Sequence, residues 1–588
     1  MMKMLQKLKI ALIQLSVCEE KTTNLNRVKD FVQEAVNKGA QLIALPECFN
    51  SPYGNKYFRK YAESIPGETS ELMSKLAKHH KIHLVAGSIP EKYENDYYNT
   101  CLVFDTDGKL LTKFRKIHLF DIDIPGKMQF KESETLKPGY NLSTFNISNI
   151  KFGLGICYDL RFPELALLYR KHGCHVLLYP GAFNLVTGPC HWELLIRSRA
   201  LDNQVYCAAI SPARSADSDY KAYGHTLISD PWGKIIGQTD EKEGIVYSAI
   251  DMDYLKEVRE QIPVSKQKRN DIYNVTGPLY IHTPCVFKFN SFIHYMSAKI
   301  LRKLKLALIQ LNISDNKLDN FKKVANYVKE AARSGSALII LPEFCCNPYS
   351  NTYYKNHGEA IPGNLFYFLS DVAKQNKVFL VAGSIPEKYN GYFYATSLAF
   401  NLNGQLLAQF RKIHLFDVNI PNKLIFNESS KIKSGNQIVT FNMYNIKIGL
   451  GRCYDLRFPE MAILYRKLGC HLLLYPSAFS YVTGPPHWEL LLRARALDNQ
   501  VYCAGVSSAA DNNPAGHTTF GHSLVTDPWG KVIAKTDEKE SILYSEIDMD
   551  YLEEVRQQMP LSNQKRGDLY SLEYYDVADP EAPFYSIP

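Results

Sequence analysis

The hydrophobic and polar positions of this chain alternate between two patterns. Short apolar runs predict strands, and apolar residues at helical spacing predict the helices between them. Short apolar runs such as Ile10–Leu15 and Gln41–Leu45 are typical of buried strands. Asn24–Lys38 carries its apolar residues at helical spacing instead, which indicates a helix with one buried face. Buried strands that alternate with such helices predict an α/β fold, in which helices cover layered sheets.

The same alternation continues along the chain. Further strands are predicted at Ile82–Gly87, Val176–Tyr179 and Val205–Ile210. Further helices are predicted at Thr69–His80, Phe162–Lys171 and His191–Asn203. Turn residues separate short apolar runs at two more places, which predicts hairpins: one joins Asn99–Asp105 to Leu110–Arg115, and one surrounds Pro231–Gly233.

The stretch Lys151–Glu164 combines a predicted strand, a cysteine and a predicted helix. Its first residues alternate apolar side chains with glycine, as in a buried strand that other backbone approaches closely. Cys157 follows in a sharp turn, before a helix with Pro163 in its first turn. A thiol at that place feels the positive end of the helix, which favours the nucleophilic thiolate. Taken alone the pattern is weak evidence, because cysteine is usually a small buried hydrophobe.

The sequence repeats itself over the length of a whole domain. Lys447–Glu460 repeats Lys151–Glu164 almost residue for residue, and other landmarks recur at the same offset. We therefore divide the chain into copy one, residues 7–275, a join, residues 276–302, and copy two, residues 303–575.

The join resembles neither copy. It is rich in aromatic residues but is interrupted by proline, lysine and histidine, so it is too polar to span a membrane and too apolar for an ordinary flexible linker. Met296–Lys305 looks like a second protein start and echoes Met1–Lys9. We infer that the chain joins two tandem gene copies, either in the gene itself or through an error across a gene boundary.

Composition narrows the class of protein. At 588 residues, 46% of them hydrophobic, the chain is too long for one ordinary domain and can bury large cores. A net charge of +8 without a basic block predicts no nucleic-acid partner and no membrane partner. The 13 cysteines are scattered and odd in number, which favours reduced thiols in a cytoplasmic protein. Met1–Lys9 runs straight into a strand, so no signal segment is predicted.

Three residues at predicted strand ends suggest a nucleophilic hydrolase: Glu47, Lys116 and Cys157. A thiolate can attack an amide carbon, a carboxylate can move the proton, and an ammonium can hold the developing oxyanion. Structural alternatives stay open, since Glu47 could cap the next segment and Lys116 could be a surface cation. We expect structural roles for His118 and His191. No zinc-type spacing, phosphate loop or Gly-x-Ser-x-Gly elbow is present in the sequence.

Three motifs, Leu45–Phe49, Arg115–Phe120 and Gly155–Glu164, resemble the nitrilase (carbon–nitrogen hydrolase) superfamily. Within it the sequence is most similar to the omega-amidase branch, on the motifs Pro46–Gly54, Asp121–Gly126, Tyr179–Asn184, Thr187–Trp192 and Asp202–Tyr206. The resemblance implies an αββα sandwich in each copy, which pairs as αββααββα within the chain or in a homo-oligomer. It also implies a Glu–Lys–Cys site that uses no cofactor and no metal.

Carried over residue by residue, the resemblance implies a role for each site residue of copy one. Cys157 is the nucleophile and Glu47 the general base, and Lys116 stabilises the oxyanion together with the backbone N–H of Tyr158. Glu132 orients the amide and the lysine. The implied substrates are small molecules, the omega-monoamides of 2-oxo dicarboxylic acids (2-oxoglutaramate and 2-oxosuccinamate), which give the 2-oxo acid and ammonia.

Such a substrate needs a cation for its distal carboxylate. Arg161 is our candidate, together with Tyr53, because a guanidinium binds a carboxylate through two hydrogen bonds. The alternative is that Arg161 is a buried structural ion-pair residue. The counterparts in copy two are Glu343, Lys412, Glu428 and Cys453 for catalysis, and Tyr349, Tyr454 and Arg457 for substrate binding.

Copy two departs from copy one close to its nucleophile. Arg452 replaces Ile156 where the strand should be buried, and a lone buried guanidinium is costly, so it needs a partner or solvent. Its field could lower the pKa of Cys453 or disturb the strand. Ala395, Ser477 and Ser480 replace Asn99, Gly181 and Asn184. We expect an active second site.

Two alternative functions stay open. Copy two could be a non-catalytic pairing scaffold. The chain could also be another amidase of the superfamily, acting on deaminated glutathione or N-carbamoyl amino acids, which Tyr475–Phe479 favours.

Overall fold

The computed structural model describes residues 5–215, 218–277, 301–346, 353–510 and 518–575. Tyr349 and most of the join therefore lie outside the described residues. The described chain forms two compact units, which are not continuous in sequence. The first unit contains residues 5–259, 275–277 and 557–571, without 216–217. The second contains residues 260–274 and 572–575 together with the described part of 301–556.

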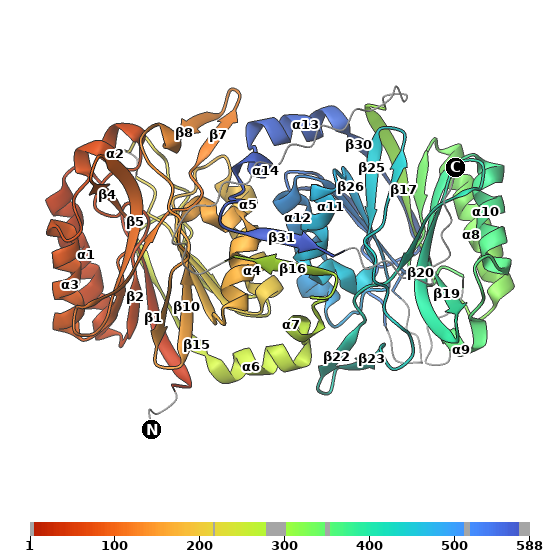
Figure 1. Ribbon diagram of the computed structural model, residues 1–588, viewed down its shortest axis with the longest axis horizontal. Helices are drawn as coiled ribbons and strands as arrows, with labels where there is room; N and C mark the ends of the chain where they lie inside the picture. Colours follow the sequence, from red (N-terminus) through yellow and green to blue (C-terminus); the bar gives the residue numbers. More distant parts are fainter. Residues whose placement is uncertain (1–4, 216–217, 278–300, 347–352, 511–517, 576–588) are drawn as a thin grey trace. The chain divides into compact units, whose positions relative to one another are not determined.

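The first sheet of the first unit has seven strands in the order β15-β1-β2-β3-β5-β4, with β6 paired to β5. The strands are β1 (Lys7–Gln14), β2 (Leu42–Ala44), β3 (His83–Val85), β4 (Ile89–Tyr93), β5 (Asp96–Phe104), β6 (Leu110–Arg115) and β15 (Gly244–Asp251). Two helices, α1 (Lys21–Asn37) and α3 (Glu68–His80), cover its outer face (Figure 1). Their apolar stripes, for example Val28 and Met73, form one buried cluster with the strands.

The second sheet of this unit has six strands in the order β14-β13-β12-β11-β10-β9. They are β9 (Thr144–Ile147), β10 (Ile150–Leu154), β11 (Val176–Pro180), β12 (Tyr206–Ile210), β13 (Leu227–Ser229) and β14 (Ile235–Gln238). Helices α4 (Pro163–Lys171) and α5 (Gly188–Asn203) lie on its other face, and β12 contacts β1 of the first sheet. The first unit is thus an αββα sandwich, as the resemblance implied.

Shorter elements connect these layers. They are α2 (Asn55–Tyr61), the hairpin β7 (Asp121–Ile124) and β8 (Met128–Lys131), and the 3₁₀ turns η1 (Glu132–Glu134) and η2 (Cys157–Arg161). After β15 the chain forms α6 (Met252–Gln261), α7 (Val264–Gln267) and β16 (Tyr273–Thr276).

The second unit repeats this architecture, with sheet orders β21-β20-β19-β18-β17-β30 and β24-β25-β26-β27-β28-β29. The strands of its first sheet are β17 (Lys303–Gln310), β18 (Leu338–Ile340), β19 (Phe379–Tyr389), β20 (Tyr392–Phe400), β21 (Leu406–Arg411) and β30 (Ser541–Asp548). Those of its second sheet are β24 (Thr440–Met443), β25 (Ile446–Leu450), β26 (Leu472–Ser477), β27 (Tyr502–Ser507), β28 (Leu524–Thr526) and β29 (Val532–Lys535).

The helices of copy two also match those of copy one. They are α8 (Lys317–Arg333), α9 (Tyr353–His357), α10 (Asn364–Asn376), α11 (Pro459–Lys467), α12 (Gly484–Asn499), α13 (Met549–Gln558) and α14 (Leu561–Gln564). The remaining elements are the hairpin β22 (Asp417–Ile420) and β23 (Leu424–Asn427), the turn η3 (Cys453–Arg457) and β31 (Ser571–Tyr574).

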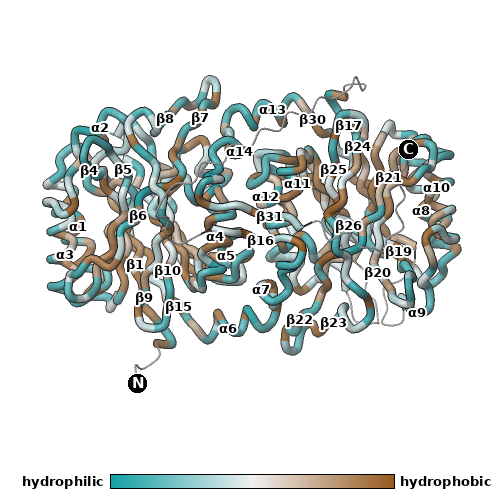
Figure 2. Tube along the Cα trace, viewed as in Figure 1, coloured by the Kyte–Doolittle hydropathy of each residue, from teal (hydrophilic) through white to brown (hydrophobic). Residues whose placement is uncertain are grey.

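The predicted strands and helices of copy one are confirmed, with ends that shift by a few residues. Figure 2 shows why hydropathy predicted these elements. The inner strands are hydrophobic over most of their length, and hydrophobic and hydrophilic residues alternate along the helices. The pattern did not predict β4, which contains Pro90 and lies at the end of its sheet, where a missing N–H is tolerated. No helix within the described residues is both long enough and apolar enough to cross a membrane.

Candidate active site

Four side chains of copy one meet between the two sheets of the first unit. Glu47 follows β2, Lys116 follows β6, Glu132 opens η1, and Cys157 opens η2. The side chains of Glu47, Lys116 and Glu132 are 0% exposed, and Cys157 is 4% exposed. The surface-cation alternative for Lys116 is therefore wrong.

The lysine ammonium bridges the two carboxylates. Lys116 Nζ lies 3.0 Å from Glu47 Oε1 and 2.9 Å from Glu132 Oε2. Asn99 Nδ2 donates a second hydrogen bond to Glu47 Oε1, at 2.8 Å. Buried charges are tolerated only when they are paired and hydrogen-bonded, and this network meets both conditions.

Two backbone N–H groups and a tyrosine also donate hydrogen bonds to the two carboxylates. Ala182 N–H donates to Glu47 Oε2 at 2.8 Å, and Phe120 N–H donates to Glu132 Oε2 at 2.8 Å. The Tyr53 hydroxyl donates to Glu132 Oε1 at 3.3 Å. Because several elements hold them, the carboxylates have fixed positions around the ammonium.

The nucleophile turn is held in an unusual backbone conformation. Cys157 has φ of 49°, in the left-handed region, which costs energy for a residue other than glycine and marks functional turns. Asp159 stabilises the turn, since its Oδ2 accepts from Ile156 N–H at 2.9 Å and its Oδ1 accepts from His118 N–H at 2.8 Å. Gly181 packs closely against this turn, because a Cβ there would lie 3.0 Å from the Cα of Cys157.

The electrostatics of the site keep the resting thiol protonated. Burial and the charge of Glu47 raise the pKa of Cys157, and Lys116 opposes them only in part. Burial also raises the pKa of Glu132, against the charge of Lys116. Burial alone would lower the pKa of Lys116, but Glu132 and Glu47 outweigh it and raise that pKa.

Burial opposes the effect of the helix end that we expected for this thiol. η2 separates Cys157 from α4, whose first residue is Pro163. The effect of a helix end falls off within one turn, so it does not overcome burial here. The thiol needs a base, and Glu47 is the carboxylate whose charge acts most strongly on the pKa of Cys157.

Further contacts behind the Cys157 turn support it, and two of them come from Gln564 and Tyr570. His118 Nδ1 lies 2.7 Å from Asp159 Oδ1, and His118 Nε2 lies 2.7 Å from the hydroxyl of Tyr570. The Tyr158 hydroxyl donates to Gln564 Oε1 at 2.8 Å. The structural role that we expected for His118 agrees with these contacts.

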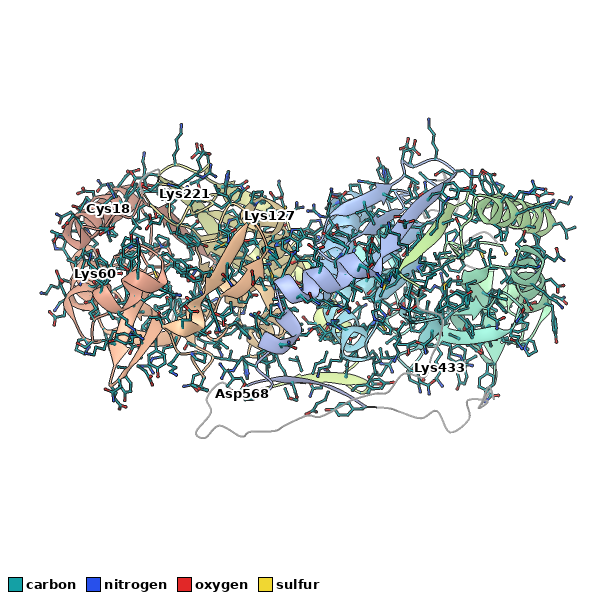
Figure 3. The ribbon with its side chains drawn as sticks, turned by 90° about the horizontal axis from the view of Figure 1, so that it is seen from above. Cys18, Lys60, Lys127, Lys221, Lys433 and Asp568 are labelled. Carbon is teal, nitrogen blue, oxygen red and sulfur yellow. The ribbon has the colours of Figure 1, made fainter. Side chains whose placement is uncertain are left out.

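Residues 557–571, which supply Tyr570 and Gln564, belong to the first unit. Lys565 Nζ pairs with Glu164 at 2.6 Å, and Arg566 Nη1 donates to the Gly139 carbonyl at 2.8 Å. Asp568, labelled in Figure 3, pairs with Arg566 at 2.6 Å. The segment thus holds the start of α4 and the loop that follows η1.

Arg161 lies buried next to His191. Its Nη1 is 3.1 Å from His191 Nδ1, and its guanidinium lies over the ring of Phe183 at 4.9 Å. It is 2% exposed. Tyr53, the other residue predicted to bind the distal carboxylate, stacks on Phe130 with ring centroids 5.4 Å apart.

The second unit contains the counterpart residues, but their contacts differ. Lys412 Nζ pairs with Glu428 Oε2 at 2.6 Å, whereas its distance from Glu343 Oε1 is 3.9 Å. Arg452 supplies the donors that Glu343 Oε1 lacks, from Nε at 3.0 Å and Nη2 at 2.7 Å. Cys453 has φ of 44° and is 8% exposed. The partner that a buried Arg452 needs is thus the glutamate of the site.

The remaining predicted residues of copy two lie as in copy one. The Tyr454 hydroxyl donates to Gln267 Oε1 at 2.6 Å, and Arg457 Nη1 is 3.2 Å from His487 Nδ1. Residue 267 belongs to the second unit. Of the predicted residues of this site, Tyr349 alone lies outside the described residues.

A family model described as carbon-nitrogen hydrolase matches residues 9–260 and, a second time, residues 305–557. The chain belongs to this family. The resemblance to the nitrilase superfamily and the tandem duplication are thereby confirmed, and the chain is a hydrolase of carbon–nitrogen bonds.

Curated relatives of this carbon–nitrogen hydrolase carry a more specific name. Omega-amidase NIT2 of Xenopus tropicalis is 56% identical over 269 residues, which cover 46% of this chain and 98% of the relative. Omega-amidase NIT2 of Homo sapiens is 55% identical over 267 residues, which cover 45% and 97%. Among solved structures, Saccharomyces cerevisiae Nit3, a member of branch 10 of the nitrilase superfamily, is 46% identical. Its alignment covers 45% of this chain and 98% of Nit3, with a TM-score of 0.42.

Sequence reasoning missed three parts of this carbon–nitrogen hydrolase site. Asn99 was noted only as a difference between the copies, although its amide holds Glu47. The N–H of Ala182 is a backbone group, which a sequence pattern does not reveal. Tyr570 does have a signal, since Tyr273 repeats it in copy one and contacts His414 at 2.6 Å, but its partner lies more than 400 residues away.

Proposed function

We propose that the chain hydrolyses omega-monoamides of 2-oxo dicarboxylic acids, such as 2-oxoglutaramate and 2-oxosuccinamate, to the 2-oxo acid and ammonia. The observation that carries the proposal is the bridge made by Lys116 between Glu47 and Glu132, beside the Cys157 thiol. The names of the relatives, omega-amidases at 55–56% identity, support the substrate class.

Acylation begins with the thiol. Glu47 accepts the proton of Cys157 as the sulfur attacks the amide carbon, so a C–S bond forms and the carbonyl oxygen becomes an oxyanion. Lys116 and the N–H of Tyr158 stabilise that oxyanion. When the C–N bond breaks, Glu47 returns the proton to the leaving nitrogen, which departs as ammonia and leaves a thioester.

Hydrolysis of the thioester reverses the same steps with water. Glu47 takes one proton from water as the oxygen attacks the thioester carbon, and Lys116 again faces the oxyanion. The C–S bond then breaks, and the proton on Glu47 restores the Cys157 thiol. The product is the free 2-oxo acid, and no redox change occurs in either half of the reaction.

The roles of the surrounding residues belong to the same proposal. Glu132 positions the ammonium of Lys116 and the substrate amide, because its Oε1 already accepts from both Lys116 and Tyr53. Arg161 binds the distal carboxylate of the substrate, and its burial supports a strong charge-assisted hydrogen bond. In copy two, Glu343, Lys412, Glu428 and Cys453 are the counterparts, with Tyr454 and Arg457 on the substrate side.

We also propose that the two copies pair within one chain as a pseudo-dimer, which the tandem family match supports. Sedimentation equilibrium near 67 kDa is the expected result for a monomeric chain. A mass of twice that value would indicate pairing between chains instead.

Ammonia release across a panel of amides tests the substrate class. The panel contains 2-oxoglutaramate, 2-oxosuccinamate, deaminated glutathione and an N-carbamoyl amino acid. We expect the omega-monoamides to give the highest kcat/KM, and the Cys157→Ala/Cys453→Ala double variant to give none. Preference for deaminated glutathione or the N-carbamoyl compound would overturn the substrate assignment.

A further inference from the structure

In the second unit an arginine occupies the hydrogen-bonding positions around the site glutamate. Arg452 is 0% exposed and donates twice to Glu343 Oε1, at 3.0 Å and 2.7 Å. The other oxygen of Glu343 accepts from Ala478 N–H at 2.9 Å, which matches Ala182 in copy one. The carboxylate therefore has the same orientation as Glu47 but different donors on one oxygen.

Two substitutions together explain the difference. In copy one the same oxygen accepts from the neutral amide of Asn99 and from Lys116. In copy two, Ala395 replaces that asparagine and cannot donate through its side chain. The guanidinium of Arg452 replaces both donors, and Lys412 binds Glu428 at 2.6 Å while it lies 3.9 Å from Glu343.

The substitutions change the charge balance of the site. With both carboxylates ionised, the first site carries two negative groups and one cation, Lys116. The second site carries two of each, because Arg452 adds a guanidinium that keeps its proton at any ordinary pH. A neutral set of four ionised groups has less tendency to take up a proton than a set with net negative charge.

The charge of Arg452 changes the pKa of the Glu343 carboxylate rather than that of the Cys453 thiol. Burial alone would raise the pKa of Glu343, but Arg452, and after it Lys412, outweigh burial and lower that pKa. Burial and Glu343 raise the pKa of Cys453. The charged and titratable groups that face this pair are Lys412, Glu428, Arg452 and Tyr354. The lowered pKa makes Glu343 a weaker proton acceptor, and the cause that copy one lacks is Arg452.

We propose that Arg452 makes the second site a poor hydrolase, because it holds Glu343 as an ion pair and prevents that carboxylate from accepting the Cys453 proton. Hydrolysis then takes place in copy one. The inference rests on the proposed function for the identity of the reaction, and it names the residue that separates the two sites.

The activity test uses the full chain with one nucleophile at a time. Cys453→Ala leaves the first site alone, and Cys157→Ala leaves the second. Loss of general acid–base catalysis costs roughly 10²- to 10⁴-fold in rate, so we expect the Cys157→Ala chain to release ammonia at least about 100-fold more slowly than the Cys453→Ala chain. Comparable rates in the two chains would overturn the proposal.

Exchange of the differing residues between the two sites then tests whether Arg452 causes the difference in rate. In the Cys157→Ala chain, Arg452→Ile with Ala395→Asn rebuilds the surroundings of the first site, and we expect at least about a tenfold gain in rate. In the Cys453→Ala chain, Ile156→Arg with Asn99→Ala should cause a loss of about 100-fold. A rebuilt second site that gains nothing, while the grafted first site loses nothing, would contradict the role of Arg452.

A measurement of thiol reactivity separates this proposal from the proposed function, because it needs no substrate. Each cysteine is alkylated with iodoacetamide in the folded full chain and followed by peptide mass spectrometry. Cys157 can pass its proton to Glu47, so we expect its rate to change little between about pH 6 and pH 8. Cys453 must release its proton to solvent, so its rate should rise about tenfold for each pH unit.

The rebuilt variant Arg452→Ile/Ala395→Asn should flatten the profile of Cys453. A flat profile for Cys453 in the unmodified chain, or a steep one in the rebuilt variant, would overturn the inference. Failure of the amide panel together with these expected profiles would reject the substrate class but keep the role of Arg452. Circular dichroism of every variant confirms that it folds.

Discussion

Arg452 and Glu343 form a two-point ion pair through one carboxylate oxygen, with nitrogens at 3.0 Å and 2.7 Å. The same oxygen of Glu47 accepts from an amide and an ammonium. The donors to this one oxygen thus differ between two sites that retain the same glutamates, lysine and cysteine. The glutamate itself is unchanged, and the difference lies in its hydrogen-bond partners.

Replacement of Glu47 by Gln should stop proton transfer in the first site. In the Cys453→Ala chain we expect kcat to fall roughly 10²- to 10⁴-fold, while the neutral amide still fits beside Lys116. Ammonia release measures the effect. The matched control is Glu91→Gln, another buried glutamate of the first unit, which binds Arg115 at 2.7 Å. If both variants kept full activity, Glu47 would not be the base.

Replacement of Lys116 by Met should destabilise the protein as well as inactivate it. Removal of one partner from a buried ion pair costs about 3–5 kcal/mol, and here two carboxylates lose their cation. We expect a lower urea midpoint and no detectable turnover in the first site. Lys113→Met is the control, because Lys113 is partly exposed and pairs with Glu91. A similar loss of stability and turnover in that variant would rule out a special role for the contact of Lys116 with Glu47 and Glu132.

Replacement of Arg161 by Gln should affect substrates according to their distal carboxylate. In the Cys453→Ala chain we expect kcat/KM to fall roughly 10- to 100-fold, the value of a charge-assisted hydrogen bond, for amides with that carboxylate. Amides without it should lose much less. Equal losses for both classes would show that Arg161 acts as a structural residue beside His191.

Replacement of Tyr570 by Phe should slow the first site, although the residue lies at the far end of the chain. The variant loses one hydrogen bond to His118, which is worth about 1 kcal/mol, and we expect a lower kcat with an unchanged KM in the Cys453→Ala chain. Tyr273→Phe is the matched control, since Tyr273 contacts His414 in the second unit. The assignment fails if Tyr273→Phe lowers the kcat of the first site as much.

Acid should destabilise the fold through two half-buried histidines. Burial, with the charges of Arg259 and Arg556 respectively, lowers the pKa of both His175 and His471 to about 4. Unfolded histidine titrates near pH 6.5, so the unfolded chain takes up protons first as the pH falls. The stabilisation is therefore complete above about pH 6.5 and is lost as the pH falls towards about 4.

Urea midpoints between about pH 7 and pH 5 measure this loss. In His175→Asn/His471→Asn we expect a smaller fall over that interval, because an amide oxygen can still accept from the N–H of Lys151 or Lys447 without titrating. His79→Asn is an exposed control and should behave like the unmodified chain. An identical fall in all three proteins would exclude His175 and His471 as the cause.

The sequence was informative where chemistry coincides with the ends of strands. Glu47 and Cys157 directly follow predicted strands, and the αββα layers follow from the alternation of apolar runs with amphipathic helices. Periodicity did not predict the contact between Asn99 and Glu47. A polar residue inside a strand is usually assigned to the solvent-facing side when its buried partner is unknown.

The pairing of Arg452 illustrates a further limit. The sequence predicted that a buried guanidinium needs a partner, but several acidic residues could have met that need. The choice of Glu343 depends on the loss of the asparagine amide at Ala395, a residue on β20, which is two strands away from β18 in the sheet. Such a compensation between distant positions is visible only when both side chains are placed.

The membership of residues 557–571 in the first unit has a consequence for biosynthesis. The ribosome makes these residues long after it has made Cys157 and Lys116, and after nearly all of the second unit. A nascent copy one therefore lacks Tyr570 and Gln564 behind the turn at Cys157. The first unit is encoded first, but its packing is complete only after most of the second unit has been synthesised.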